Sequence, residues 1–104
     1  MTDLLVIQTT TGTREDAQQI AAALVEQRLA ACVQISGPIE SVFRWEGQQQ
    51  TSEEWLVTIK TGQEKFAEVE RAILARHPYD QPEIIALPVL EANAGYAHWV
   101  RESL

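Results

Sequence analysis

The feature that most constrains this fold is a pair of long strand-like segments around one polar turn. Residues 39–45 and 51–60 alternate apolar with polar side chains, and residues 46–50 between them read Glu-Gly-Gln-Gln-Gln. Two such segments around a polar turn predict a β-hairpin. In a chain of 104 residues, a hairpin of this length is expected to extend beyond the core. Its projecting end should need a partner, because free strand edges tend to aggregate.

The other elements follow from the spacing of apolar residues. Residues 4–7, 29–36 and 84–90 have strand patterns, and Gly37-Pro38 predicts a bulge or bend after the second of them. Capping-box patterns at Thr13 and Thr61 open two amphipathic helices, and Asn93 can cap a short last one. This order predicts one α+β domain over residues 1–104: a ferredoxin-like βαββαβ sandwich with an extra short C-terminal helix.

Composition narrows the class of partner. Eight basic and fifteen acidic residues give a net charge of −7, so we expect no nucleic-acid partner. No apolar run approaches the ~20 residues that cross a bilayer, so we expect no membrane association. The single cysteine, Cys32, suits a reducing compartment and is expected to pack in the core. The N-terminus lacks the basic region of a signal peptide, and the sequence therefore predicts a cytoplasmic protein.

The segment His77-Pro78-Tyr79-Asp80-Gln81-Pro82-Glu83-Ile84 is the richest in chemical groups. Its prolines fix φ and hold the preceding residues extended, so the second helix should end near residue 76 and the chain should continue stiffly into the last strand. Stiff loops that carry an imidazole, a phenol and carboxylates often have a function. The alternative is a plain helix-to-strand turn in which Tyr79 covers the edge of the core.

Several segments together resemble one family. They are Leu29-Ala30-Ala31-Cys32-Val33, Ser41-Val42-Phe43-Arg44-Trp45-Glu46-Gly47, Lys60-Thr61, the segment 77–84 with its two prolines, and Tyr96 with Trp99. In this order and at these spacings they resemble the CutA divalent-cation tolerance proteins over essentially the whole chain. The resemblance implies a ferredoxin-like fold assembled as a tight homotrimer through its hairpins, similar to PII signalling proteins. It also implies a role in tolerance of copper and other divalent metals.

The candidate metal ligand is His77, because neutral imidazole commonly binds transition metals. Copper sites proposed in the family use a cysteine at the end of the first strand and a histidine pair before Pro-Tyr. This chain has Thr9 at the first position and Arg76-His77 at the second. A metal site here would have to gather ligands from several subunits, since one histidine does not make a closed site.

We expect a small ligand, either a metal ion or an anion, in clefts between subunits lined by Lys60, Tyr79, Glu83 and Trp45. Lys60 would pair with an anionic ligand or with a carboxylate near Tyr79. The tryptophans favour subunit packing over ligand stacking, and the neighbouring pair Glu53-Glu54 reads as a solvated face.

Two other hypotheses stay open at this point. An enzyme would use Tyr79 or His77 as acid–base groups with Lys60 as an electrostatic partner, although the sequence has no nucleophile beside a base and no phosphate loop. A structural trimer would act only through partner proteins.

Overall fold

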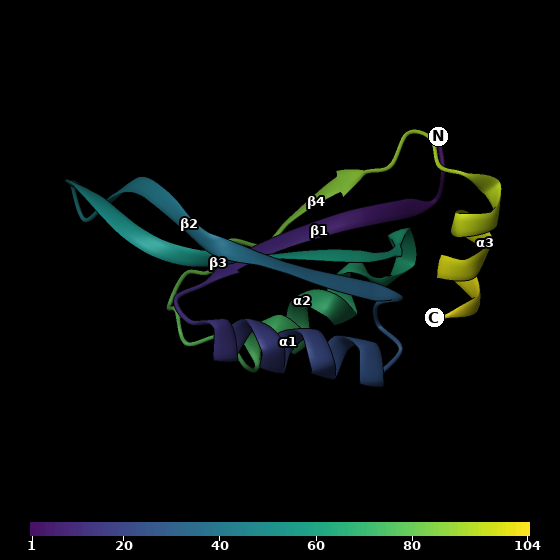
Figure 1. Ribbon diagram of the computed structural model, residues 1–104, viewed down its shortest axis with the longest axis horizontal. Helices are drawn as coiled ribbons and strands as arrows, with labels where there is room; N and C mark the ends of the chain where they lie inside the picture. The colour runs from purple at the N-terminus through teal and green to yellow at the C-terminus, as the bar shows by residue number, and fades with distance from the viewer.

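The computed structural model describes residues 1–104 and has a four-stranded antiparallel sheet with the strand order β2-β3-β1-β4. Helices α1 and α2 cover one face of the sheet, the β2–β3 hairpin projects from one end, and α3 lies at the other (Figure 1). The elements are β1 (Leu4–Thr11), α1 (Arg14–Glu26), β2 (Cys32–Trp45), β3 (Gln48–Gly62), the short 3₁₀ helix η1 (Gln63–Lys65), α2 (Phe66–Leu74), β4 (Ile85–Pro88) and α3 (Ala94–Glu102). The predicted α+β, ferredoxin-like class is confirmed.

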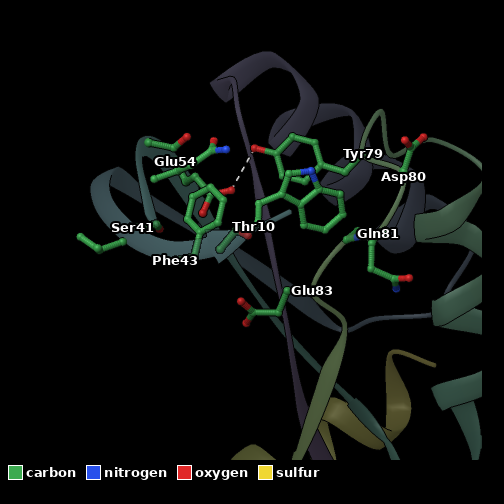
Figure 2. Close-up of a pocket in the computed structure, with 13 residues that line it drawn as sticks. Thr10, Ser41, Phe43, Glu54, Tyr79, Asp80, Gln81 and Glu83 are labelled. Carbon is green, nitrogen blue, oxygen red and sulfur yellow. Dashed lines mark hydrogen bonds between the residues drawn. The ribbon is translucent and has the colours of Figure 1, made fainter. Parts of the chain in front are cut away.

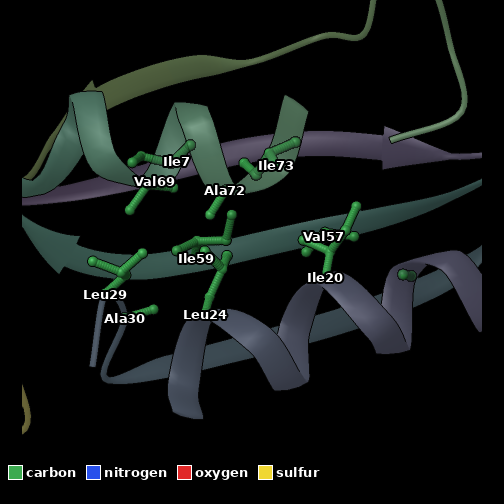
Figure 3. Packing of buried hydrophobic residues seen from close by; sticks show 11 residues of the cluster. Ile7, Ile20, Leu24, Leu29, Ala30, Val57, Ile59, Val69, Ala72 and Ile73 are labelled. Atoms are coloured by element: carbon green, nitrogen blue, oxygen red, sulfur yellow. The ribbon is translucent and has the colours of Figure 1, made fainter. Parts of the chain in front are cut away.

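The core lies between the two helices and the sheet. Ile7 of β1 and Ile59 of β3 point toward the helices and are fully buried, as are Val69 and Ile73 of α2. Alternate strand residues and every third or fourth helix residue meet in this layer. The sequence therefore shows apolar residues at every second position in the strands and at every third or fourth position in the helices. Figure 3 shows these side chains interleaved between strand and helix.

The hairpin extends past the rest of the sheet, as predicted. β1 pairs with β3 only from Trp55 to Gly62, so residues 48–54 of β3 have β2 as their sole neighbour. The turn is tighter than expected: only Glu46 and Gly47 lie between the strands, with φ of 51° and 78°. Both residues have positive φ, which is typical of the two-residue turns that match strand twist. The register shift between Ser36 and Ile39 confirms the predicted bulge.

Three local predictions were wrong. β1 continues through Thr11, because Thr9 and Thr11 are fully buried strand residues rather than loop punctuation. β2 begins at Cys32 and not at Leu29, which instead packs in the core after the end of α1. Thr61 does not cap a helix: its hydroxyl donates to the Leu29 carbonyl at 2.7 Å, and η1 has no side-chain cap.

Helices α1 and α3 begin where the sequence indicates. The Thr13 hydroxyl accepts a hydrogen bond from the Asp16 amide at 3.1 Å, and Asn93 Oδ1 accepts one from the Tyr96 amide at 3.0 Å. Arg101 fastens α3 to the sheet end, since it donates to both Glu64 oxygens and pairs with Asp3. No helix is long and apolar enough to cross a membrane.

Candidate functional site

A groove of about 830 Å³ lies between the hairpin and the proline-rich segment that joins α2 to β4. Its aromatic lining residues are Phe43, Trp45 and Tyr79, and its acidic ones are Glu54, Asp80 and Glu83; Thr10, Ser41, Val42, Gln50, Ser52, Gln81 and Pro82 complete the wall. Phe43, Glu54 and Tyr79 converge on one part of the groove (Figure 2). The groove exists because β3 continues beyond the end of β1, and the segment 77–84 crosses the space left beside it.

His77 holds this segment in place. Its Nε2 lies 2.7 Å from the Thr10 carbonyl and its Nδ1 lies 3.2 Å from the Tyr79 amide nitrogen. A carbonyl only accepts and an amide only donates, so Nε2 carries the proton and Nδ1 accepts. The imidazole also packs against the Tyr79 ring, with centroids 4.8 Å apart. His77 therefore fixes where Tyr79 stands.

Tyr79 is joined across the groove to Glu54. The phenol donates to Glu54 Oε2 at 2.9 Å. Gly12 makes room for this phenol, since a Cβ at that position would lie 3.2 Å from the Tyr79 oxygen. Burial, followed by the hydrogen bond to the Glu54 carboxylate, raises the pKa of Tyr79 to about 12. The phenol stays protonated at neutral pH and acts there as a donor.

The residues of one chain do not fit a metal site. Both ring nitrogens of His77 are engaged by the backbone, and no three histidine, cysteine or acidic side chains lie close enough together to hold an ion. Closed transition-metal sites need three or four such ligands. The predicted role of His77 as a metal ligand thus has no support within a single chain, and the geometry gives the residue a positioning role.

Lys60 does not lie at the groove. It follows Glu54 by six residues along β3, which places it about 20 Å away at ~3.3 Å per residue. Its ammonium donates to Gln34 Oε1 at 2.7 Å, on the sheet face opposite the helices. No lysine or arginine lines the groove, so one chain does not form the predicted anion site around Lys60 and Tyr79. Lys60 and Glu54 lie on the same face of β3, but the distance along the strand separates the two groups.

The structure brings together three of the four predicted ligand residues, Trp45, Tyr79 and Glu83, and adds Phe43 and Glu54. Glu54 was expected on a solvated face, yet it is only 8% exposed. Trp55 and Val57 point toward the helices. Because side chains alternate along a strand, the sequence indicated that Glu54 faces the opposite side of the sheet. Its hydrogen-bond partner, Tyr79, lies 25 residues further along the chain.

Cys32 was also expected in the core. It is a free, half-buried thiol at the start of β2, directly opposite Lys60, and therefore lies on the sheet face that the helices leave open.

The groove does not assemble the acid–base set of the enzyme hypothesis. That hypothesis requires Lys60, His77 and Tyr79 in one cleft, and the structure separates Lys60 from the other two. A phenol with a pKa of about 12 is also poorly matched to proton transfer near pH 7.

Comparison with known proteins identifies relatives over nearly the whole chain. Residues 5–103 match the family model of the CutA1 divalent ion tolerance protein. The divalent-cation tolerance protein CutA of Thermus thermophilus is 43% identical over 98 residues, which cover 94% of this chain and 95% of the relative. The chloroplastic protein CutA of Arabidopsis thaliana is 39% identical over 95% of this chain, which spans 54% of that longer protein.

Solved structures agree with the sequence relatives. The divalent cation tolerance protein of Thermus thermophilus has a TM-score of 0.94 at 42% identity, covering 96% of this chain and 97% of its own. The CutA structure from Archaeoglobus fulgidus has a TM-score of 0.93 at 39% identity, with coverage of 96% and 97%.

The prediction of a cytoplasmic location, which was drawn from the single cysteine and the N-terminal sequence, is wrong. The Archaeoglobus fulgidus structure is that of a periplasmic divalent cation tolerance protein, and the Arabidopsis thaliana relative is chloroplastic. Relatives with this fold therefore occupy different compartments. One cysteine and an acidic surface do not distinguish between them.

The family match, the identities of 39–43% and the TM-scores of 0.93 and 0.94 cover nearly the whole chain, including the hairpin and the proline-rich segment that form the groove. The chain belongs to the CutA1 divalent ion tolerance family.

Proposed function

We propose that this chain is a single domain that assembles as a homotrimer and acts in tolerance of divalent cations, copper included, by binding a metal ion or small ligand at clefts between subunits. The observation that carries the proposal is that the outer edges of the hairpin strands have no pairing partner within the chain. Residues 48–54 of β3 have no strand on the β1 side, and β2 is an edge strand along its whole length. Exposed edges of this length call for strand pairing with another chain.

Exposed apolar side chains support the same assembly. Val42, Phe43 and Trp45 on the hairpin are 59%, 39% and 44% exposed. On the sheet face that no helix covers, Ile85 and Leu87 of β4 are 46% and 45% exposed. Apolar patches shared by an open sheet face and a projecting hairpin are typical of subunit interfaces.

The groove is the proposed ligand site, with Trp45, Tyr79 and Glu83 in its wall. A trimer would place Lys60 and His77 of one subunit nearer to groups of another, which is how metal ligands absent from one chain could be gathered. The relatives' shared description as divalent-cation tolerance proteins supports a metal-related role.

Assembly is tested by light scattering during gel filtration. A homotrimer has a mass of about 35 kDa, three times the 11.7 kDa of one chain. Leu87→Asp on the open sheet face should lower the mass toward one chain. The matched control is Leu74→Asp, on α2 and 52% exposed, which should leave the trimer intact. A mass of 11.7 kDa for the unaltered protein would refute the trimer.

Metal binding is tested by calorimetric titration of metal-free protein with Cu(I), Cu(II) and Zn(II). The chain has two histidines, which gives a matched pair of variants. A metal bound by His77 in the trimer would have to replace one of the two backbone hydrogen bonds of the ring. His77→Ala should then abolish stoichiometric binding, while His98→Ala, at an exposed residue paired with Glu102, should not. Absence of any binding tighter than ~10 μM, about −7 kcal/mol, would show that the chain contributes to tolerance without holding the metal.

A further inference from the structure

The last helix, α3, lies outside the main core. Of its nine residues only Val100 is buried, and the core cluster between the sheet and the other two helices does not include Val100. Tyr96 and Trp99 pack against each other and remain 42% and 47% exposed. A segment with so few buried apolar contacts can open locally while the rest of a domain stays folded.

Two arginines make the hydrogen bonds and ion pairs that join α3 to the rest of the chain. Arg101, on the helix, donates to both oxygens of Glu64 at 2.6 and 3.0 Å and to the Asp3 carbonyl at 2.9 Å, and it also pairs with the Asp3 carboxylate. Arg28, which follows α1, donates to the Glu102 carbonyl at 3.2 Å. Asp3 precedes β1 and Glu64 follows β3, so Arg101 ties α3 to the end of the sheet at which β1 begins and β3 ends (Figure 1).

The docked position of Arg101 depends on its acidic partners. Its side chain is 30% exposed, and its Nε is enclosed without a partner. A partly enclosed cation is stable only while charged or polar partners offset its loss of hydration. Asp3 and Glu64 supply those partners, and both carboxylates are more than half exposed, so salt in solution screens the attraction. Removal of a carboxylate, or a higher salt concentration, should therefore favour the undocked helix.

Gly62 leaves the space in which this contact forms. A Cβ at position 62 would overlap the Glu64 carboxylate and the Arg101 guanidinium. The backbone of Gly62 is extended, with φ of −98° and ψ of 154°, so it accepts alanine without strain. Gly62→Ala therefore disturbs the ion pair without removing a charge.

We propose that α3 is an ion-gated strap: it undocks as a unit while the sheet stays folded, and the contact of Arg101 with Asp3 and Glu64 sets how often it does so. Opening uncovers Val100 and frees both carboxylates at this end of the sheet. The inference goes beyond the proposed function and does not depend on it.

The test is hydrogen–deuterium exchange of the assembled protein, read by mass spectrometry of peptides from α3 and from β3. Glu64→Gln and Gly62→Ala should each speed exchange of α3 by about three- to tenfold, because a hydrogen bond between charged groups is lost, and should leave exchange of β3 unchanged. The matched control is Glu102→Gln. It removes the same charge from an exposed residue whose carboxylate pairs with His98 on the same helix, and it should change exchange of α3 by less than about twofold.

Salt separates gating by charge from a plain packing effect. In the unaltered protein, a rise from about 0.05 M to about 0.5 M NaCl should speed exchange of α3 by about two- to threefold, and the increase should be smaller in Glu64→Gln. Exchange of α3 only in step with β3 would overturn the inference, as would the absence of a salt effect or equal effects of Glu64→Gln and Glu102→Gln. All proteins are compared at one concentration with their mass read by light scattering, and faster exchange that accompanies a loss of mass would count against local opening.

Discussion

The hydrogen bond between Tyr79 and Glu54 is the contact that closes the groove, and Tyr79→Phe removes it with the loss of one oxygen atom. The variant leaves a carboxylate that is 8% exposed without its only partner. An unmatched charged group of this kind costs ~1.5–3 kcal/mol. Tyr79 is 38% exposed, so water can replace part of the lost interaction, and we expect a loss of roughly 1–2 kcal/mol in the free energy of unfolding.

The measurement is urea unfolding at pH 7 with all proteins at one concentration, because assembly makes stability depend on concentration. Tyr96→Phe is the matched control. Tyr96 is the only other tyrosine, it is 42% exposed, and its hydroxyl makes no hydrogen bond in the chain, so its loss should cost less than ~0.5 kcal/mol.

A double-mutant cycle with Glu54→Gln isolates the pair. A neutral amide is easier to leave unmatched than a carboxylate, so Tyr79→Phe should cost about 1 kcal/mol less in the Glu54→Gln background. If the two changes are additive within ~0.3 kcal/mol, the hydrogen bond is not what stabilises this wall, and the reasoning fails.

Three further predictions concern Tyr79 and the hydrophobic core. In Tyr96→Phe, spectrophotometric titration of the remaining Tyr79 should have a midpoint near 12, above its usual value of 10.0, and Glu54→Gln should lower it only partly because burial is the larger cause. Because the pKa of Tyr79 is raised in the folded protein, the stability that the protonated phenol contributes is present below pH 10 and is lost as the pH rises through 12. A titration midpoint of Tyr79 near 10 would contradict the geometry. Gly12→Ala places a Cβ 3.2 Å from the Tyr79 oxygen and should shift that midpoint downward by displacing the phenol. Ile59→Ala empties a fully buried core site and should cost ~2–5 kcal/mol in urea unfolding, with a loss below 1 kcal/mol excluding its core role.

Local patterns were sufficient for the fold because each element carries its own signal. Thr13 and Asn93 cap helices where the sequence places them, and the bulge after Ser36 follows from Gly37-Pro38. The predictions that failed at Thr61 and Leu29 share a cause. Thr61 donates to the Leu29 carbonyl, a contact between residues 32 positions apart that no local pattern reveals.

The candidate site was only partly predictable, for the same reason on a larger scale. The segment 77–84 and Trp45 were recognisable from their residue types, but the sequence does not state how far β3 runs past β1. That length decides that Glu54 meets Tyr79 and that Lys60 does not. Strand parity places side chains on a face, whereas the register between strands determines which residues meet across it.

This register has a chemical consequence for the ligand. Had the crossing segment met β3 six residues further on, Tyr79 would stand beside Lys60, and the groove would present an ammonium with a phenol to an anion. The observed pairing ends β1 at Thr11, opposite Trp55, so the first residue of β3 beyond that pairing is Glu54. The sign of the groove is therefore set by where β1 stops, and the buried threonines that extend β1 to that point determine that a carboxylate, and not an ammonium, faces Tyr79.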